Sequence, residues 1–164
     1  MTMNENTRVR VTMEDGGEFV IELMGEYAPA TAENFENLVS EGFYDGLTFH
    51  RVIAGFMAQG GDPTGTGMGG SGQNIHGEFA SNGFGTNTLK HERGVISMAR
   101  SMDKDSASSQ FFICFEPAPH LDGEYAAFGR VTEGMEVVDA FADVPTDYMD
   151  KPLTPIVIKT MEIE

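Results

Sequence analysis

The sequence contains no tryptophan, one cysteine and only 10 lysine and arginine residues among its 164. The single cysteine, Cys114, excludes an intramolecular disulfide, and its apolar neighbours Ile113 and Phe115 indicate a buried, unreactive thiol. No apolar run approaches the ~18–20 residues that a membrane span requires. Segment 1–7 has no apolar core, which argues against a secretory signal. We therefore expect a cytoplasmic protein.

Positive charge is scarce, because 26 acidic residues outweigh 10 basic ones, giving a net charge of −16 and a pI near 4.4. Only four residues are lysine, at positions 90, 104, 151 and 159. Without a cationic stripe the chain cannot release phosphate counterions, so we expect it to bind neither nucleic acid nor an anionic membrane. The acids are spread along the whole chain, which favours a halophilic protein in molar salt, where the Debye length is ~3 Å. An acidic mesophilic protein is the alternative.

Hydrophobic residues make up 40% of the chain, which is enough to form a single globular domain. The pattern predicts strands at 9–13, 18–23, 94–99, 111–115, 126–132 and 156–161, and helices at 29–39 and 135–141. Segment 63–88 is rich in Gly, Asn, Ser and Thr, which predicts an irregular loop. Many short strands with two helices favour a closed antiparallel barrel, although this pattern alone leaves a sandwich open.

Residues 49–62, Phe-His-Arg-Val-Ile-Ala-Gly-Phe-Met-Ala-Gln-Gly-Gly-Asp, carry the strongest functional signal. The Ala-Gly pair divides this segment into two short strands with a bend between them. Alternate side chains of a strand share a face, which groups Phe49, Arg51 and Ile53 together and Met57 with Gln59. A guanidinium, a carboxamide and apolar walls would thus meet on one shallow surface that contains no nucleophile.

Three other motifs predict no site. Gly65–Gly70 matches G-x-G-x-x-G, but loop residues follow where a helix must begin, and no basic residue lies between Arg51 and Lys90. The four histidines, at 50, 76, 91 and 120, lack the spacing of a zinc site. No serine stands in a G-x-S-x-G motif. Nucleotide binding, a metal site and hydrolase chemistry are therefore disfavoured.

Segment 49–62 resembles the signature of the cyclophilins, a family of peptidyl-prolyl cis–trans isomerases. The resemblance covers roughly residues 7–163, and its further blocks are 94–100, 108–114, 121–123, 128–131 and 134–138. It implies a mostly β fold, a closed eight-stranded antiparallel barrel capped by two helices, in one domain over 1–164. It also implies an isomerase that acts on X–Pro bonds of peptides and folding proteins without a metal or cofactor. We expect a monomer.

The same resemblance assigns roles to ten residues. It makes Arg51 the catalytic hydrogen-bond donor. The walls of the proline pocket are Phe56, Met57, Phe112 and Leu121, with Tyr125 closing it. Polar contacts to the peptide come from Gln59 and Gln110, and backbone groups of Ala99 and Arg100 hold the residue before proline. Strand parity places Phe111 in the core instead, and a plain core position is the alternative for Met57 and Phe112.

Three positions depart from the animal-type pattern of the family. His120 stands in place of a tryptophan, Tyr125 in place of a histidine and Arg100 in place of an asparagine. Segment 100–106 instead resembles the bacterial subtype. Tyrosine can still close the pocket, so we expect turnover to survive. The family's tryptophan contributes to binding of cyclosporin-type ligands, and its absence argues against tight binding here.

Two other functions fit part of the sequence. A proline-peptide-binding module or holding chaperone with incidental isomerisation would need the apolar pocket but not Arg51. An isomerase of the FKBP-like class would use an aromatic pocket without the Phe-His-Arg segment, so it ranks last. The change Arg51→Ala separates the first alternative from an isomerase, because it should abolish turnover while peptide affinity falls much less.

Overall fold

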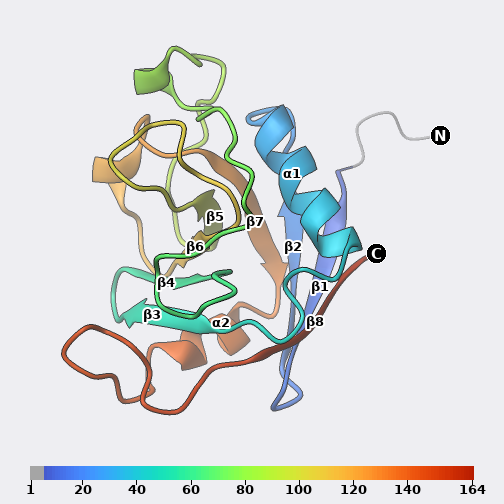
Figure 1. The fold of residues 1–164 in the computed structure, drawn as a ribbon, viewed down its shortest axis with the longest axis vertical. Coiled ribbons are helices and arrows are strands. Elements are labelled where there is room, and N and C mark those ends of the chain that lie inside the picture. The colour runs from blue at the N-terminus through green and yellow to red at the C-terminus, as the bar shows by residue number, and fades with distance from the viewer. Residues whose placement is uncertain (1–5) are drawn as a thin grey trace.

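A computed structural model describes residues 6–164, and its main feature is one eight-stranded antiparallel sheet (Figure 1). The strands are β1 (Arg8–Met13), β2 (Glu18–Leu23), β3 (Phe49–Ile53), β4 (Met57–Gly60), β5 (Val95–Met98), β6 (Phe111–Cys114), β7 (Ala127–Glu133) and β8 (Ile158–Ile163). Their order across the sheet is β3-β4-β6-β5-β7-β2-β1-β8. The helices are α1 (Pro29–Ser40) and α2 (Met135–Phe141), with short 3₁₀ turns η1 (Ala80–Asn82) and η2 (Pro119–Leu121). None of the helices within 6–164 is long and apolar enough to cross a membrane.

The sheet is strongly curved but remains an open half-barrel, so the prediction of a closed barrel is wrong. The end strands β3 and β8 form no ladder with each other. An isolated bridge between Thr48 and Val157 joins the two edges. It is flanked by hydrogen bonds from the N–H of Phe49 to the carbonyl of Ile156 at 3.0 Å and from the N–H of Ile158 to the carbonyl of Leu47 at 2.8 Å.

The predicted helices and most predicted strands are present within two or three residues of their expected bounds. α1 begins at Pro29, which fits the first turn of a helix because its missing N–H has no helical partner there. The predicted apolar stripe of α1, formed by Phe35, Leu38 and Val39, is buried. The last strand begins at Ile158, two residues later than predicted, and the isolated bridge at Val157 immediately precedes it.

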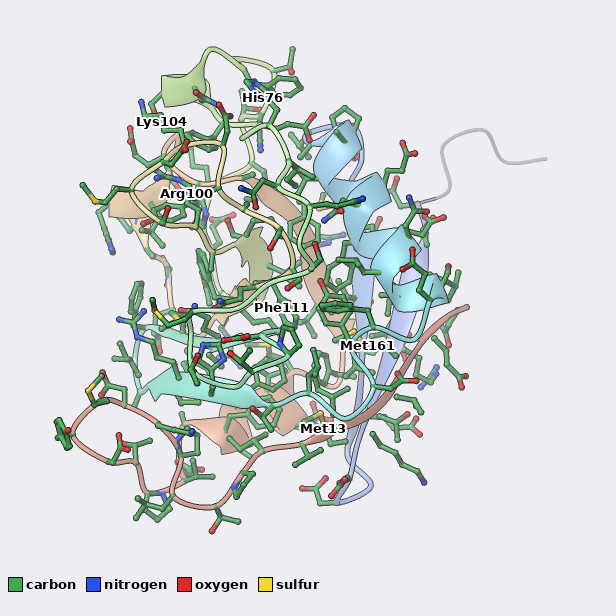
Figure 2. The ribbon with its side chains drawn as sticks, viewed as in Figure 1. Met13, His76, Arg100, Lys104, Phe111 and Met161 are labelled. Carbon is green, nitrogen blue, oxygen red and sulfur yellow. The ribbon has the colours of Figure 1, made fainter. Side chains whose placement is uncertain are left out.

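The main core lies between the curved sheet and α1. The ring of Phe35 lies 5.1 Å from Tyr44, 5.5 Å from Phe111 and 5.2 Å from Phe128, so aromatic side chains fill the centre. Figure 2 shows Phe111 among these interior side chains. A second, smaller buried cluster includes Met57, Phe112, Cys114, Ala118 and Leu121. As strand parity predicted, Phe111 belongs to the main core and its neighbour Phe112 to the smaller cluster.

A β-bulge in β3 overturns the predicted grouping of Phe49 with Arg51. The register against β4 shifts between these two residues, which leaves His50 as the extra residue. Phe49 and Val52 therefore both point into the main core, while Arg51 is exposed on the opposite face. The bulge thus directs the guanidinium outward, above the smaller apolar cluster.

Candidate active site

A cavity of about 300 Å³ lies over the smaller apolar cluster. It is lined by Arg51, Phe56, Met57, Gln59, Ala99, Arg100, Phe112, Leu121 and Tyr125. These are nine of the ten residues named from the sequence. The tenth, Gln110, lines an adjoining cavity of about 190 Å³ that shares Gln59, Ala99 and Arg100 with the first. The structure therefore brings the predicted residues together in two connected hollows.

Buried apolar side chains form the floor of the larger cavity. Met57, Phe112 and Leu121 are 2%, 5% and 8% exposed, so they belong to a packed cluster and line the cavity as well. The Phe112 ring meets the Tyr125 ring edge-on, with centroids 5.9 Å apart. Phe56 forms a side wall, and its ring lies 5.6 Å from that of His120. Imidazole thus occupies the place where the animal-type pattern has the larger indole.

His91 supports the floor from behind, a role that the sequence did not reveal. Its ring stacks on Phe112 at 5.9 Å and 15°. Nδ1 lies 3.0 Å from Oδ1 of Asp122, and Nε2 lies 2.8 Å from Oγ of Ser97. Burial lowers the pKa of His91, although Asp122 opposes this effect. A neutral ring with both nitrogens bonded holds Phe112 in one orientation.

Arg51 extends over this floor from β3 and is exposed. Its Nη1 donates to Oε1 of Gln59 at 3.2 Å. Within residues 6–164 no carboxylate forms an ion pair with Arg51. Most of the donors of its guanidinium are therefore free to face a ligand in the cavity.

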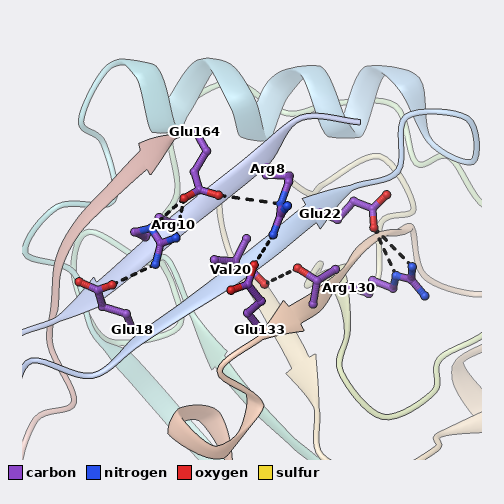
Figure 3. Close-up of polar contacts among 9 residues, drawn as sticks. Arg8, Arg10, Glu18, Val20, Glu22, Arg130, Glu133 and Glu164 are labelled. Atoms are coloured by element: carbon purple, nitrogen blue, oxygen red, sulfur yellow. Dashed lines mark hydrogen bonds and ion pairs between the residues drawn. The ribbon is translucent and has the colours of Figure 1, made fainter. Parts of the chain in front are cut away.

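The six arginines of the chain divide into those that pair with a carboxylate and those that do not. Arg8, Arg10, Arg93 and Arg130 each pair with a carboxylate, and Figure 3 shows three of these four on the outer face of β1, β2 and β7. In a chain of net charge −16, the arginines that lack such a partner in the described part of the chain are Arg51 and Arg100. Both line the cavity, so the uncompensated positive charge of the arginines is concentrated there.

Arg100 is held in place by aromatic rings and carbonyl groups. Its guanidinium lies 4.6 Å from the Tyr125 ring centroid and 4.9 Å from that of Phe79. Nε and Nη2 donate to the carbonyl of Glu124 at 3.2 and 2.7 Å. Figure 2 places Arg100 in the upper part of the molecule, away from α2. Arg100 therefore fixes Tyr125 against the cavity and also adds charge to its rim.

The two glutamines and Ala99 are bonded to one another. Nε2 of Gln59 donates to Oε1 of Gln110 at 2.8 Å. The N–H of Ala99 donates to the backbone carbonyl of Gln110 at 3.0 Å. The side-chain N–H groups of Gln110 donate to carbonyls of the loop after β4. Gln110, which immediately precedes β6, is thus bonded to the loop after β4 and does not line the larger cavity.

The residues set aside on sequence grounds all lie within 6–164. Cys114 is fully buried, and burial raises the pKa of its thiol to about 12, so it is a structural side chain as predicted. Nowhere in residues 6–164 do three His, Cys, Asp or Glu side chains gather in a way that could hold a metal ion. The segment Gly65–Gly70 is an irregular loop, without the helix that a dinucleotide site requires.

Comparison with known proteins agrees with this geometry. The sequence profile of the family described as cyclophilin type peptidyl-prolyl cis-trans isomerase/CLD matches residues 8–163. The chain is 53% identical over 124 residues to peptidyl-prolyl cis-trans isomerase B of Bacillus subtilis, covering 76% of this chain and 82% of that protein. It is 52% identical over 125 residues to a peptidyl-prolyl cis-trans isomerase of Helicobacter pylori, covering 75% and 73%.

A solved structure shows the same fold. The crystal structure of a cyclophilin from Cryptosporidium parvum, determined in the presence of the dipeptide Ala-Pro, has 36% sequence identity and a TM-score of 0.85. The similarity covers 96% of this chain and 98% of that one. The resemblance predicted from residues 49–62 is therefore confirmed: the chain belongs to the cyclophilin-type peptidyl-prolyl cis–trans isomerases.

Proposed function

We propose that Arg51 is the group that accelerates rotation of the X–Pro bond in this isomerase. The observation that carries the proposal is its position, exposed above a buried apolar floor and without a carboxylate partner in residues 6–164. A partnered arginine would have to break an ion pair before it could help a substrate. Arg51 is ready to donate as soon as a peptide enters.

The chemistry needs little more than one oriented donor. Rotation about an X–Pro bond breaks amide resonance, at a barrier of ~18–20 kcal/mol. In the twisted state the ring nitrogen regains its lone pair and accepts a hydrogen bond. A guanidinium beside that nitrogen stabilises the twisted state more than either planar state, which is the requirement for catalysis. A 10⁴-fold acceleration corresponds to ~5.5 kcal/mol.

The apolar residues of the cavity would hold the proline ring. We assign Phe56, Met57, Phe112 and Leu121 as its walls and Tyr125 as the closing side chain, because all five line the same 300 Å³ hollow. Gln59, Gln110 and the backbone of Ala99 and Arg100 would contact the peptide before the proline. The carboxamide of Gln110 already bonds to Gln59 and to the loop after β4. Gln110 would therefore contact the peptide through its CH₂ groups or through the free lone pair of Oε1.

The substrates would be proline-containing peptides and unfolded or folding proteins, bound by a single domain that spans 1–164 and acts as a monomer. A dipeptide of this type, Ala-Pro, was present with the C. parvum relative. The acidic surface would exclude nucleic acid and anionic membranes. With His120 beside Phe56 in place of an indole, cyclosporin-type ligands would bind weakly. Turnover would vary little between about pH 6 and 8, because a guanidinium stays protonated there.

The alternative role is that of a binding module or holding chaperone. A proline-limited refolding assay with wild type and Arg51→Ala, at several KCl concentrations, tests the proposal. We expect the variant to lose at least ~10²-fold in catalysed refolding, while its affinity for a proline peptide falls only severalfold. Equal catalysis by both proteins would contradict a catalytic role for Arg51 and favour the binding module. The KCl series ensures that an unfolded sample is not mistaken for an inactive one.

A further inference from the structure

A buried carboxylate organises the loop that follows β4. Asp62 is 1% exposed. Its two oxygens accept the backbone N–H groups of Thr64 at 2.8 Å, Thr66 at 3.1 Å, Gly67 at 2.6 Å and Gly69 at 3.1 Å. The Thr64 hydroxyl also bonds to both oxygens, at 2.8 and 2.9 Å. The loop therefore wraps around an internal anion.

Glycine is required where this loop approaches the carboxylate. A Cβ on Gly69 would lie 2.3 Å from Oδ1 of Asp62, and Gly67 has a φ of 90°. These amides belong to the G-x-G-x-x-G segment, whose backbone N–H groups would otherwise suit a phosphate. Burial opposes ionisation of Asp62, but the hydrogen bonds from Thr64, Gly69 and Gly67 outweigh it and hold its pKa far below the usual range.

With the amides facing inward, two loop carbonyls face the active site. Nε2 of Gln110 donates to the carbonyls of Gly67 at 3.0 Å and Gly69 at 2.8 Å. Oε1 of Gln110 accepts from Nε2 of Gln59 at 2.8 Å. Oε1 of Gln59 in turn accepts from Nη1 of Arg51 at 3.2 Å. A continuous series of hydrogen bonds thus joins the loop to the guanidinium.

The direction of every bond in this series is determined at its ends. Carbonyls can only accept and a guanidinium can only donate. Each glutamine carboxamide therefore has one orientation in which no donor faces a donor and no acceptor faces an acceptor. If the carboxamide of Gln110 were flipped, its oxygen would face the carbonyl oxygens of Gly67 and Gly69. If the carboxamide of Gln59 were flipped, its NH₂ group would face the N–H donors of Arg51.

We infer that Asp62 is a positioning residue for the isomerase reaction: by holding the loop, it orients Gln110 and Gln59 so that an acceptor meets Arg51. This inference rests on the proposed catalytic role of Arg51. A guanidinium fastened at one nitrogen keeps its other donors directed at the cavity, and small misplacements of a reacting group are costly in rate.

The test is a double-mutant cycle with Asp62→Asn and Gln110→Leu. The carboxamide introduced by Asp62→Asn would place an NH₂ group against backbone N–H donors, so the loop carbonyls would shift. We expect Asp62→Asn to lower kcat/KM about tenfold, mainly through kcat, with KM changed less than about twofold. In the Gln110→Leu background, the same change should alter kcat/KM by less than about twofold, because the series is already broken.

Glu78 supplies a matched control. It is 4% exposed, and its carboxylate accepts the N–H of Thr31 at 2.7 Å and of Ala30 at 3.2 Å, at the start of α1 and away from the series. Glu78→Gln should lower the unfolding midpoint and leave kcat within about twofold of wild type. Thr64→Val is the substitute if Asp62→Asn does not fold, because it only replaces the hydroxyl beside Asp62 with a methyl group. We expect Thr64→Val to lower kcat two- to threefold, and we expect no such loss in the Gln110→Leu background.

Three results would overturn the inference without affecting the proposed role of Arg51. The first is a wild-type kcat in a folded Asp62→Asn variant. The second is an equal loss of kcat/KM from Asp62→Asn in the wild-type and the Gln110→Leu backgrounds. Equal kcat losses in Asp62→Asn and Glu78→Gln would also overturn it, because general destabilisation would then explain both. A variant Arg51→Ala with full turnover would refute the proposed function itself, so that failure is distinct from the others.

Discussion

Arg51 and Gln59 face each other directly across the pairing of β3 with β4, and Nη1 of the arginine lies 3.2 Å from Oε1 of the glutamine. The distance between the donor and its orienting group is therefore set by two paired strands and not by a mobile loop. Sites built on strands hold their geometry more closely than sites on loops.

This relationship predicts the effect of Gln59→Leu. The change removes the acceptor of Arg51 and the donor to Gln110 and leaves an apolar side chain that is one bond shorter. We expect kcat/KM to fall about tenfold with little loss of stability, since Gln59 is half-buried. Exchange NMR on a proline peptide provides the measurement. Full activity in Gln59→Leu would mean that Arg51 needs no orienting partner.

Phe111 and Phe112 provide a matched pair, because they are adjacent in β6 and belong to opposite buried clusters. Phe111→Leu should destabilise the fold by about 1–2 kcal/mol and leave peptide affinity unchanged. Phe112→Leu should destabilise the fold by a similar or smaller amount and also weaken peptide binding, because its ring forms the cavity floor. Urea midpoints and peptide titrations of both variants test this. Equal affinities would remove Phe112 from the pocket.

Two buried histidines predict how stability depends on pH. Burial lowers the pKa of both His50 and His91 below the unfolded value of ~6.5. Below about pH 6.5 the unfolded chain therefore binds more protons than the folded one, so stability falls as the pH falls. The fall continues until the pH reaches the lowered folded pKa values.

Each of these protons contributes at most about 1.4 kcal/mol per pH unit in that window. Urea unfolding of wild type at pH 7.5 and 5.5 should show the loss. His91→Gln should be less stable at both pH values but show a smaller difference between them. An unchanged difference would mean that the pKa of His91 is the same in the folded and the unfolded chain.

The local sequence pattern was enough to predict helices and strands in which the hydrophobic residues recur with a regular helical or strand period. β2 was predicted at its observed bounds, and α1 from Pro29 and its apolar stripe. Parity also separated Phe111 from Phe112, because β6 is a regular strand. Nine of the ten named site residues line one cavity, which follows from motifs that recur in the family rather than from periodicity.

Features that depend on long-range contacts could not be predicted. The bulge at His50 breaks the period of β3, and nothing in its local composition signals an extra residue. The loop after β4 was predicted as irregular, yet Asp62 orders it through bonds to amides up to seven residues away. His91 was excluded as a metal ligand but not recognised as the support of Phe112, because Phe112 and Asp122 are both distant from it in sequence.

The acidic composition predicts a strong response of stability to salt. Exposed ion pairs such as Arg10–Glu18 would weaken in KCl, but pairs of this kind add little to stability. Repulsion among 26 acidic residues would be screened at the same time. We expect the thermal midpoint to rise steeply between low salt and molar KCl, as in a halophilic cytoplasm. A flat response would indicate an acidic mesophilic protein.

The most direct test of Arg51 is the cis–trans exchange rate of a proline peptide saturated on the enzyme, measured by NMR for wild type, Arg51→Ala and Arg51→Lys. We expect the rate on the Arg51→Ala variant to be about 10²–10³-fold lower than on wild type. Arg51→Lys should be intermediate, because an ammonium keeps the charge but not the planar fork. Peptide affinity should change only severalfold in both variants. Equal exchange rates on wild type and Arg51→Ala would contradict catalysis by this guanidinium.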